Sequence, residues 1–140
     1  MRYDMAHELD RFFGEDFEVE YIFFEGKEAV LVNGELIVCI DGRVFRKTKK
    51  YGFIEVNGRK KSTGYTSTYF KGKEISTHRL VAWFFVPNMK AKPEINHRDG
   101  NKLNNSAMNL EWCNRSENMK HAYRMGLHPR TGRRARGATA

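Results

Sequence analysis

Five dipeptides that end in glycine punctuate the first half of the chain at short intervals. Such pairs, above all Asn-Gly and Asp-Gly, tolerate the positive φ angles of tight hairpin turns. The spacing therefore predicts a meander of short antiparallel strands, and the high content of Phe and Tyr favours strands over a Leu-rich bundle. The pairs are Glu25-Gly26, Asn33-Gly34, Asp41-Gly42, Asn57-Gly58 and Lys71-Gly72. The predicted strands are Ala29–Val32, Glu35–Ile40, Val44–Arg46, Tyr51–Val56 and Tyr65–Phe70.

The segment before the meander predicts one helix and one further strand. Apolar side chains recur at helical spacing over residues 3–13, and Gly14 follows as a stop signal. Every second residue from Phe17 to Phe23 is apolar, which is typical of a half-buried strand with that face toward the core.

The second half of the chain predicts a helix, two strands and another helix. The first helix begins after Thr77 and ends before Pro87. Asn114 and Glu117 have the spacing of a capping box, so a last helix is expected from there to Gly126. The strands between the helices are predicted at Glu94–His97 and Leu110–Cys113.

Charge is divided unevenly along the chain, whose formal net charge is +8. Residues 1–37 contain ten acidic and three basic side chains, so the remaining residues hold an excess of fifteen positive charges. An excess of that size favours a polyanionic partner, with nucleic acid as the first candidate. The alternative is a solvated basic surface that only aids solubility.

The cysteines and the hydropathy exclude several classes of protein. Cys39 and Cys113 are far apart in sequence and form no CxxC motif, so a cysteine-based zinc site is not expected. A disulfide between them stays open, although two reduced core thiols are the simpler reading. No apolar run approaches the ~20 residues of a membrane span. The acidic N-terminus does not resemble a signal peptide, so a soluble protein of the cytoplasm is predicted, that of the host cell if the gene belongs to a phage.

Four polar side chains near the two later strands form the candidate site. His97 ends the first strand, preceded by Asn96, while Asn118 and His121 are three residues apart on one face of the last helix. A helix packed across the strands brings them into one cleft. An imidazole of near-neutral pKa can take a proton from water, and amide oxygens are hard ligands that suit Mg²⁺ or Mn²⁺. Singly, each residue is more often structural, and only the joint spacing indicates phosphodiester hydrolysis.

The same region carries a dense run of motifs. They are His78-Arg79-Leu80-Val81-Ala82, Pro87-Asn88, Glu94-Ile95-Asn96-His97-Arg98-Asp99-Gly100-Asn101-Lys102-Leu103-Asn104-Asn105, Asn109-Leu110-Glu111-Trp112, Ser116-Glu117-Asn118 and His121-Ala122. This pattern closely resembles the HNH endonucleases, in their phage and intron-associated homing branch. The resemblance covers roughly residues 37–126. It implies an α+β fold in which a short antiparallel β-meander, preceded by an N-terminal helix, leads into a ββα-metal motif.

The resemblance also implies a role for each site residue. His97 corresponds to the general base, and Asn109 to the central Asn whose side chain holds the loop between the strands. Asn96 and Asn118 correspond to the ligands of a Mg²⁺ or Mn²⁺ ion. Many relatives have Asp at the position of Asn96, so a neutral amide there predicts weak metal binding without DNA. His121 is expected to contact the scissile phosphate or to support the ligands.

Double-stranded DNA is the expected partner. The predicted contacts are basic side chains of the meander loops and of the surroundings of the cleft, and they imply salt-dependent binding with limited sequence specificity. They are Arg46, Lys47, Lys49, Lys50, Arg59, Lys60, Lys61, Arg79, Arg98, Lys102, Arg115, Lys120 and Arg124. Each active site would cut one strand, so the chain is expected to act as a monomer or as a dimer.

Three regions are expected along the chain. Residues 1–36 form an acidic region of helix and strand that packs on the meander or binds another protein. Residues 37–126 form the nuclease domain with its leader strands, and residues 127–140 form a basic flexible tail. Two other functions remain open: a catalytically weak or inactive DNA-binding or packaging accessory that retains the fold, and a nuclease directed at RNA.

Overall fold

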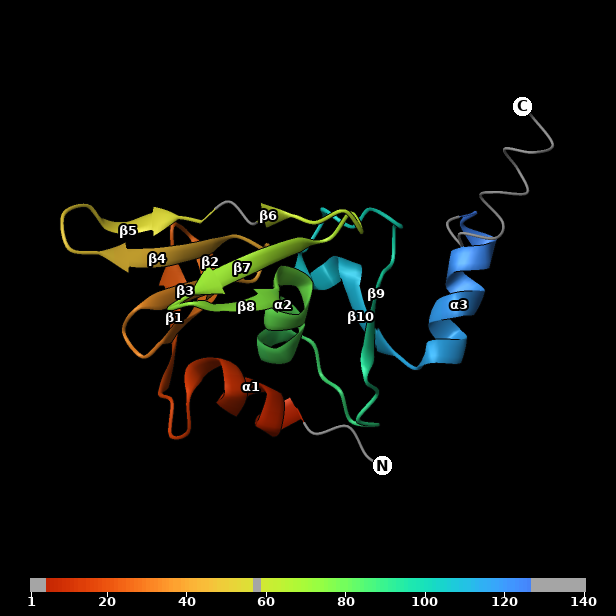
Figure 1. Ribbon diagram of the computed structural model, residues 1–140, viewed down its shortest axis with the longest axis horizontal. Helices are drawn as coiled ribbons and strands as arrows, with labels where there is room; N and C mark the ends of the chain where they lie inside the picture. Colours follow the sequence, from red (N-terminus) through yellow and green to blue (C-terminus); the bar gives the residue numbers. More distant parts are fainter. Residues whose placement is uncertain (1–4, 57–58, 127–140) are drawn as a thin grey trace.

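The computed structural model describes residues 5–56 and 59–126 and consists of three antiparallel sheets and three α-helices. The largest sheet is a five-stranded meander whose strands lie side by side in chain order. Its strands are β1 (Val19–Phe24), β2 (Lys27–Val32), β3 (Leu36–Cys39), β4 (Val44–Thr48) and β5 (Gly52–Glu55). The predicted hairpin turns join them, and at Asn33 and Gly34 both φ angles are positive, +51° and +67°. Figure 1 shows this sheet at the opposite end of the molecule from the last helix.

A smaller sheet and helix α2 follow the meander in the chain, and helix α1 precedes it. The sheet contains β6 (Arg59–Lys60), β7 (Thr66–Phe70) and β8 (Lys73–Ser76), of which only β7 is predicted from the sequence. The first helix, α1 (Met5–Phe13), ends at Gly14 as expected, and α2 (Thr77–Phe85) follows β8 directly. Asn57-Gly58 lies outside the described residues.

The last three elements form a ββα unit. Strands β9 (Glu94–His97) and β10 (Leu110–Cys113) pair antiparallel, with the 3₁₀ turn Ala107–Asn109 just before β10. Helix α3 (Arg115–Arg124) begins with the predicted capping box, in which the Asn114 side chain accepts from the Glu117 amide and the Glu117 side chain accepts from the Asn114 amide. All three elements have the bounds that the sequence predicts to within a residue or two.

Helix α2 lies at the centre of the main core. Leu80, Val81 and Ala82 are fully enclosed there, together with Val30 of the meander and Leu110 of the ββα unit. Trp83 and Trp112 belong to the same cluster, so both indole rings are part of the core. A second, smaller cluster on the other face of the meander contains Ile37 and Phe45.

The structure corrects the predicted face of β1. Tyr21 and Phe23 were expected to point toward the core, but their side chains are 73 % and 77 % exposed. The intervening residues Ile22 and Phe24 are the ones that pack, and the Phe24 ring lies 4.7 Å from that of Phe45. The reason is that β1 is an edge strand, and on its Tyr21 face the main core does not extend over it. The alternation of apolar residues therefore predicted the strand correctly but predicted the wrong face of it as buried.

Several other expectations concern the chain as a whole. Cys39 and Cys113 are both buried and free, which confirms the two reduced thiols, and burial raises their pKa values to about 11 and about 12. No helix in the described part of the chain is long and apolar enough to cross a membrane. The division after residue 36 stays a prediction about organisation. It falls within β3, which is hydrogen-bonded to β2 in the same sheet. The basic tail, residues 127–140, lies outside the described residues.

Candidate active site

Strand β9 presents its side chains to two different environments. Asn96 pairs with Glu111 across the ladder and lies on the same face as Glu94, whose carboxylate accepts a hydrogen bond from Asn118 of α3. His97 pairs with Leu110 and points the other way, toward the interior. His97 is the last residue of the strand, so side chains from both faces lie close together at this end.

One cavity of about 200 Å³ collects the predicted residues. Asn96, His97, Asn118 and His121 all line it, together with Tyr65 from the segment that enters β7. The fold therefore brings together the four side chains that were expected to converge, while their chemical roles stay predictions. His121 donates a hydrogen bond through Nε2 to the carbonyl oxygen of Arg98 at 3.1 Å.

His97 is the most enclosed of the four. Only 4 % of the residue is exposed, and its Nε2 lies 2.9 Å from Oδ1 of Asn105. Its ring lies 5.0 Å from the ring of His78 and 5.7 Å from that of Tyr65. Burial lowers the pKa of His97 below its ordinary value, against an opposing effect of the Asn105 hydrogen bond. The imidazole is therefore neutral at physiological pH, which is the form that accepts a proton.

His78 is a structural neighbour of this ring. It is buried at the start of α2 and stacked on Tyr65 at 4.9 Å, and its Nδ1 is enclosed without a hydrogen-bond partner among the described residues. Burial lowers its pKa to about 3, with His97 adding a smaller effect. A histidine that is neutral and buried at this depth is more consistent with a core residue than with a side chain that contacts phosphate.

Asn109 holds the loop that joins β9 to β10. Its Nδ2 donates to Oδ1 of Asp99 and to the carbonyl oxygen of Asn104, both at 2.9 Å, and its Oδ1 accepts from the Asp99 amide. Asp99 also accepts from Asn104 and from the amide of Asn101. These hydrogen bonds lower the pKa of Asp99, so it stays charged at the centre of the loop. These contacts hold the loop in one conformation, and the role of Asn109 as the central Asn of the motif stays a prediction.

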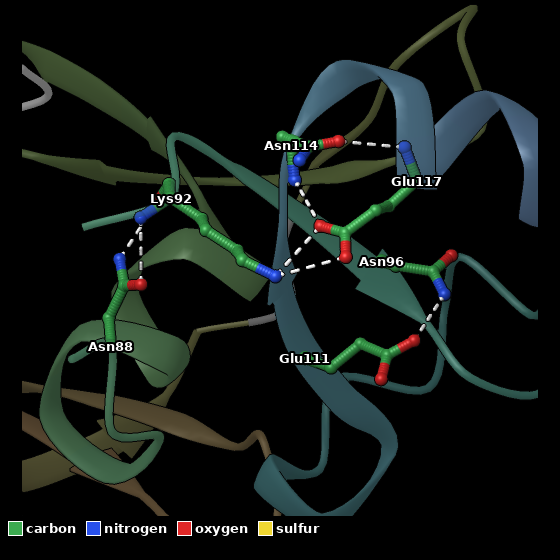
Figure 2. Close-up of polar contacts among 6 residues, drawn as sticks. All are labelled: Asn88, Lys92, Asn96, Glu111, Asn114 and Glu117. Carbon is green, nitrogen blue, oxygen red and sulfur yellow. Dashed lines mark hydrogen bonds and ion pairs between the residues drawn. The ribbon is translucent and has the colours of Figure 1, made fainter. Parts of the chain in front are cut away.

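Each of the two amides predicted as metal ligands is oriented by a carboxylate. Nδ2 of Asn96 donates to Oε1 of Glu111 at 2.8 Å, and Nδ2 of Asn118 donates to Oε1 of Glu94 at 2.9 Å. Figure 2 shows the Asn96 nitrogen turned to Glu111 and its oxygen turned away. Because each nitrogen is occupied, each amide leaves its oxygen free, and the two nearby carboxylates make the surroundings negative. This donor set fits a hard divalent cation. No group of three or more His, Cys, Asp or Glu side chains that could hold a metal occurs in the described ranges.

An ion pair fastens α3 beside the strand. Lys92 Nζ contacts both carboxylate oxygens of Glu117, at 2.8 and 3.0 Å, while that carboxylate also accepts from the Asn114 amide. Asn88 in turn bridges the amide and carbonyl groups of Lys92 (Figure 2). The loop after α2 is thereby tied to the first turn of α3, the helix that carries Asn118.

The predicted DNA contacts divide into free and engaged side chains. Arg79 forms a paired hydrogen bond with Glu8 at 2.7 Å, and Lys61 contacts Glu74 at 2.8 Å. Arg98 lies 3.5 Å from Glu111, and Lys102 donates to the carbonyl oxygen of Thr63. These side chains already bind the protein itself. Exposed positions are occupied by Arg46, Lys47, Lys49, Lys50, Lys60, Arg115, Lys120 and Arg124, and the side chain of Arg59 lies outside the described part.

Three residues of the site are not singled out by the sequence analysis. Asn105 belongs to an Asn-rich loop, and such loops are ordinarily turns. Glu94 and Glu111 lie on strands next to apolar residues. The cross-strand register brings Glu111 to Asn96, and the position of α3 beside β9 brings Asn118 to Glu94. Alternation along β9 places Glu94 beside Asn96, so this part of the signal is present in the sequence.

Comparison with known proteins gives a consistent result. Residues 76–120 match the family model described as HNH endonuclease. The chain is 40 % identical over 90 residues to an uncharacterized HNH endonuclease of Acanthamoeba polyphaga mimivirus, covering 64 % of this chain and 27 % of that protein. It is 42 % identical over 64 residues to a putative HNH homing endonuclease derived from the SPbeta prophage of Bacillus subtilis, covering 46 % of this chain and 37 % of that protein.

The fold matches a solved structure as well. The chain resembles the HNH homing endonuclease I-HmuI, whose structure concerns DNA binding and cleavage. The two structures superimpose with a TM-score of 0.56 and 27 % sequence identity. The match covers 78 % of this chain and 60 % of the other. In sequence, the chain is 38 % identical over 56 residues to I-HmuI of Bacillus phage SP01, covering 40 % of this chain and 32 % of that protein. The chain thus spans about a quarter to a third of the curated relatives' length, and the predicted fold class is confirmed.

Proposed function

We propose that this chain hydrolyses phosphodiester bonds of double-stranded DNA, because residues 76–120 match the family model described as HNH endonuclease. The observation that carries the proposal is the placement of a neutral, buried His97 beside Asn96 at the end of β9, in a cavity closed by Asn118 and His121 of α3. The similarity to I-HmuI, which is named a DNA endonuclease and whose structure concerns DNA binding and cleavage, supports DNA as the substrate.

His97 acts in this proposal as the general base. Its free ring nitrogen accepts a proton from a water molecule, whose oxygen then forms a bond to phosphorus while the bond from phosphorus to the leaving oxygen breaks. The lowered pKa keeps the ring able to accept that proton at neutral pH. Asn109, through its contacts with Asp99 and Asn104, keeps the loop after His97 in one conformation. His121, which also lines the cavity, would contact the scissile phosphate.

The amide oxygens of Asn96 and Asn118 would hold a divalent cation, Mg²⁺ or Mn²⁺. Such an ion, when bound, stabilises negative charge on the phosphate and on the leaving oxygen. Both direct ligands are neutral, so the charge that attracts the ion comes from Glu94 and Glu111 behind them and from the DNA phosphate. We therefore expect affinity for the ion to rise when DNA is present.

Basic side chains on two surfaces would grip the duplex. The β4–β5 hairpin carries exposed Lys47, Lys49 and Lys50, and α3 beside the cavity carries exposed Lys120 and Arg124. These contacts would be made to phosphates, which gives affinity without strong sequence preference. One site cuts one strand, so a double-strand break would need a dimer or two binding events.

A plasmid digest tests the proposal. Supercoiled plasmid is incubated with the full chain and Mg²⁺, Mn²⁺ or a chelator, and nicked and linear products are separated on a gel. We expect metal-dependent nicking that disappears in His97→Ala, while a gel-shift assay shows unchanged DNA binding. A protein that binds the plasmid but leaves it supercoiled with either ion is instead a DNA-binding accessory. Cleavage that is suppressed by competing RNA and not by DNA indicates an RNA-directed nuclease.

A further inference from the structure

Asn105 is the one side chain that hydrogen-bonds to the ring of His97 among the described residues. The contact is buried, since both residues are less than a tenth exposed. A neutral imidazole has a single N–H, carried by either Nε2 or Nδ1. With Oδ1 of Asn105 as the acceptor, the proton must sit on Nε2 and Nδ1 keeps its lone pair. Which tautomer His97 adopts therefore depends on which end of the Asn105 amide faces it.

A second hydrogen bond holds that amide. Nδ2 of Asn105 donates to Oγ1 of Thr66 at 3.0 Å, while Oδ1 faces Nε2 of His97. Thr66 begins β7, so the amide lies between the small sheet and the strand that ends at His97. An amide turned the other way would offer a donor to Nε2 and place the proton on Nδ1, which would then have no lone pair to act as the base.

The five-stranded meander fixes the backbone of Asn105. A Cβ atom placed on Gly42, in the turn between β3 and β4, would lie 2.7 Å from the carbonyl carbon of Asn105 and 2.8 Å from its oxygen. Gly42 has a φ of +96°, which other residues rarely adopt. Nearby, the Ala107 amide donates to the carbonyl oxygen of Ile40 at 2.8 Å; Ala107 is two residues after Asn105, and Ile40 is two residues before Gly42. The turn between β3 and β4 is thus packed directly against the backbone of Asn105, the residue that contacts His97.

We propose that Asn105 is a positioning residue that holds His97 as the Nε2–H tautomer, with Nδ1 free as the base, and that the meander keeps Asn105 in place. This inference rests on the proposed function only in the use it gives to Nδ1. The tautomer itself is a property of the protein without DNA or metal, so it is measured independently of cleavage.

Nitrogen NMR of the full chain, ¹⁵N-labelled at histidine and free of metal and DNA, tests the proposal at pH 8. In the wild type we expect His97 to show a protonated Nε2 and an unprotonated Nδ1. Asn105→Leu removes the acceptor, so its His97 signals should shift to a mixture of both tautomers. Asn105→Asp keeps an acceptor and should restore the Nε2–H form. Asn104→Ala is the matched control, because Asn104 contacts Asp99 in the same loop and not His97.

Cleavage kinetics give the second readout. We expect Asn105→Leu to lower kcat by about 10- to 100-fold with little change in KM for DNA, and Asn105→Asp to recover most of the loss. If Asn105→Leu does not fold, Thr66→Val serves in its place, because it frees the amide to turn without changing the shape of the side chain. Folding of each variant is checked by its amide NMR spectrum.

Three results would overturn the inference. They are a wild-type His97 protonated on Nδ1, a variant without an acceptor that keeps the wild-type tautomer, and an Asn104→Ala control that shifts it as strongly as Asn105→Leu. Absence of cleavage by a wild-type protein with the Nε2–H tautomer would instead reject the proposed function and leave the positioning role intact.

Discussion

The two faces of strand β9 orient their functional side chains in different ways. On the inner face, His97 is held by Asn105 and by the rings of Tyr65 and His78, all neutral groups in a buried setting. On the outer face, Asn96 is held by Glu111, a charged group whose side chain is 38 % exposed. The proposed base is thus held mainly by packing, whereas the amide proposed as a metal ligand is held by a charged side chain.

This difference has consequences for how each half of the site responds to its surroundings. Buried neutral hydrogen bonds are little affected by salt, while partly exposed charges are screened. We expect mutations of the inner face to lower the rate at any metal concentration. Mutations of the outer face should instead change how much metal the reaction needs.

The largest expected effect separates the two histidines of the cavity. Loss of a general base lowers rates by about 10²- to 10⁴-fold, so His97→Ala should reduce single-turnover cleavage by that factor, and added Mg²⁺ should not restore it. His121→Ala should cost less, because His121 hydrogen-bonds to a backbone carbonyl on the rim of the loop. Equal losses in the two variants would contradict the assignment of the base to the inner face.

An intermediate effect is expected on the outer face. Asn118→Ala removes one ligand oxygen and should raise the Mg²⁺ concentration for half-maximal cleavage by about 10- to 100-fold, with the rate at saturation recovering in part. Ser116→Ala, at an exposed position of the same helix, is the matched control and should leave the Mg²⁺ dependence unchanged. A loss that no concentration of Mg²⁺ relieves would place Asn118 outside the metal site.

The buried ring of His78 makes stability depend on pH. Its pKa is about 3 in the folded protein and near 6.5 in the unfolded chain, so the unfolded chain binds the proton first as pH falls. The contribution of His78 to the free energy of unfolding is therefore fully present above pH 6.5. It declines as the pH falls toward 3, by up to about 1.4 kcal/mol per pH unit. Urea unfolding at pH 4, 5 and 6 should show a shallower decline in His78→Gln than in the wild type. Parallel pH profiles for the two proteins would mean that His78 is not buried in its neutral form.

The smallest expected effect concerns the DNA grip. Lys47→Ala should reduce the slope of log affinity against log salt by about 1, with cleavage at low salt almost unchanged. Lys27→Ala, an exposed lysine of β2 in the acidic region, is the control and should leave the slope as it is. If Lys27→Ala lowers the slope as much as Lys47→Ala does, the acidic region also lies against the duplex.

Much of the architecture follows from local signals. The Asn33-Gly34 turn has the positive φ angles that its residue types allow, and the capping box at Asn114 and Glu117 starts α3 where the sequence places it. His97 and Asn109 stand out from the motif spacing. These features depend on residues close together in the chain, and their conformational preferences are the same in any fold.

The remaining features depend on contacts between distant residues. Arg79 is a basic residue of a nuclease motif, and yet its guanidinium binds Glu8, which is 71 positions away. Alternation along β1 does not reveal which side is covered, because that depends on where the core ends. The Asn105 amide meets His97 only because Thr66 of β7 and the Gly42 turn of the meander close around it. The sequence by itself determined most of the strands, the three helices and the position of the predicted base. Only the tertiary structure decided how that base is oriented, since a tautomer is set by the neighbours that packing brings within hydrogen-bond distance.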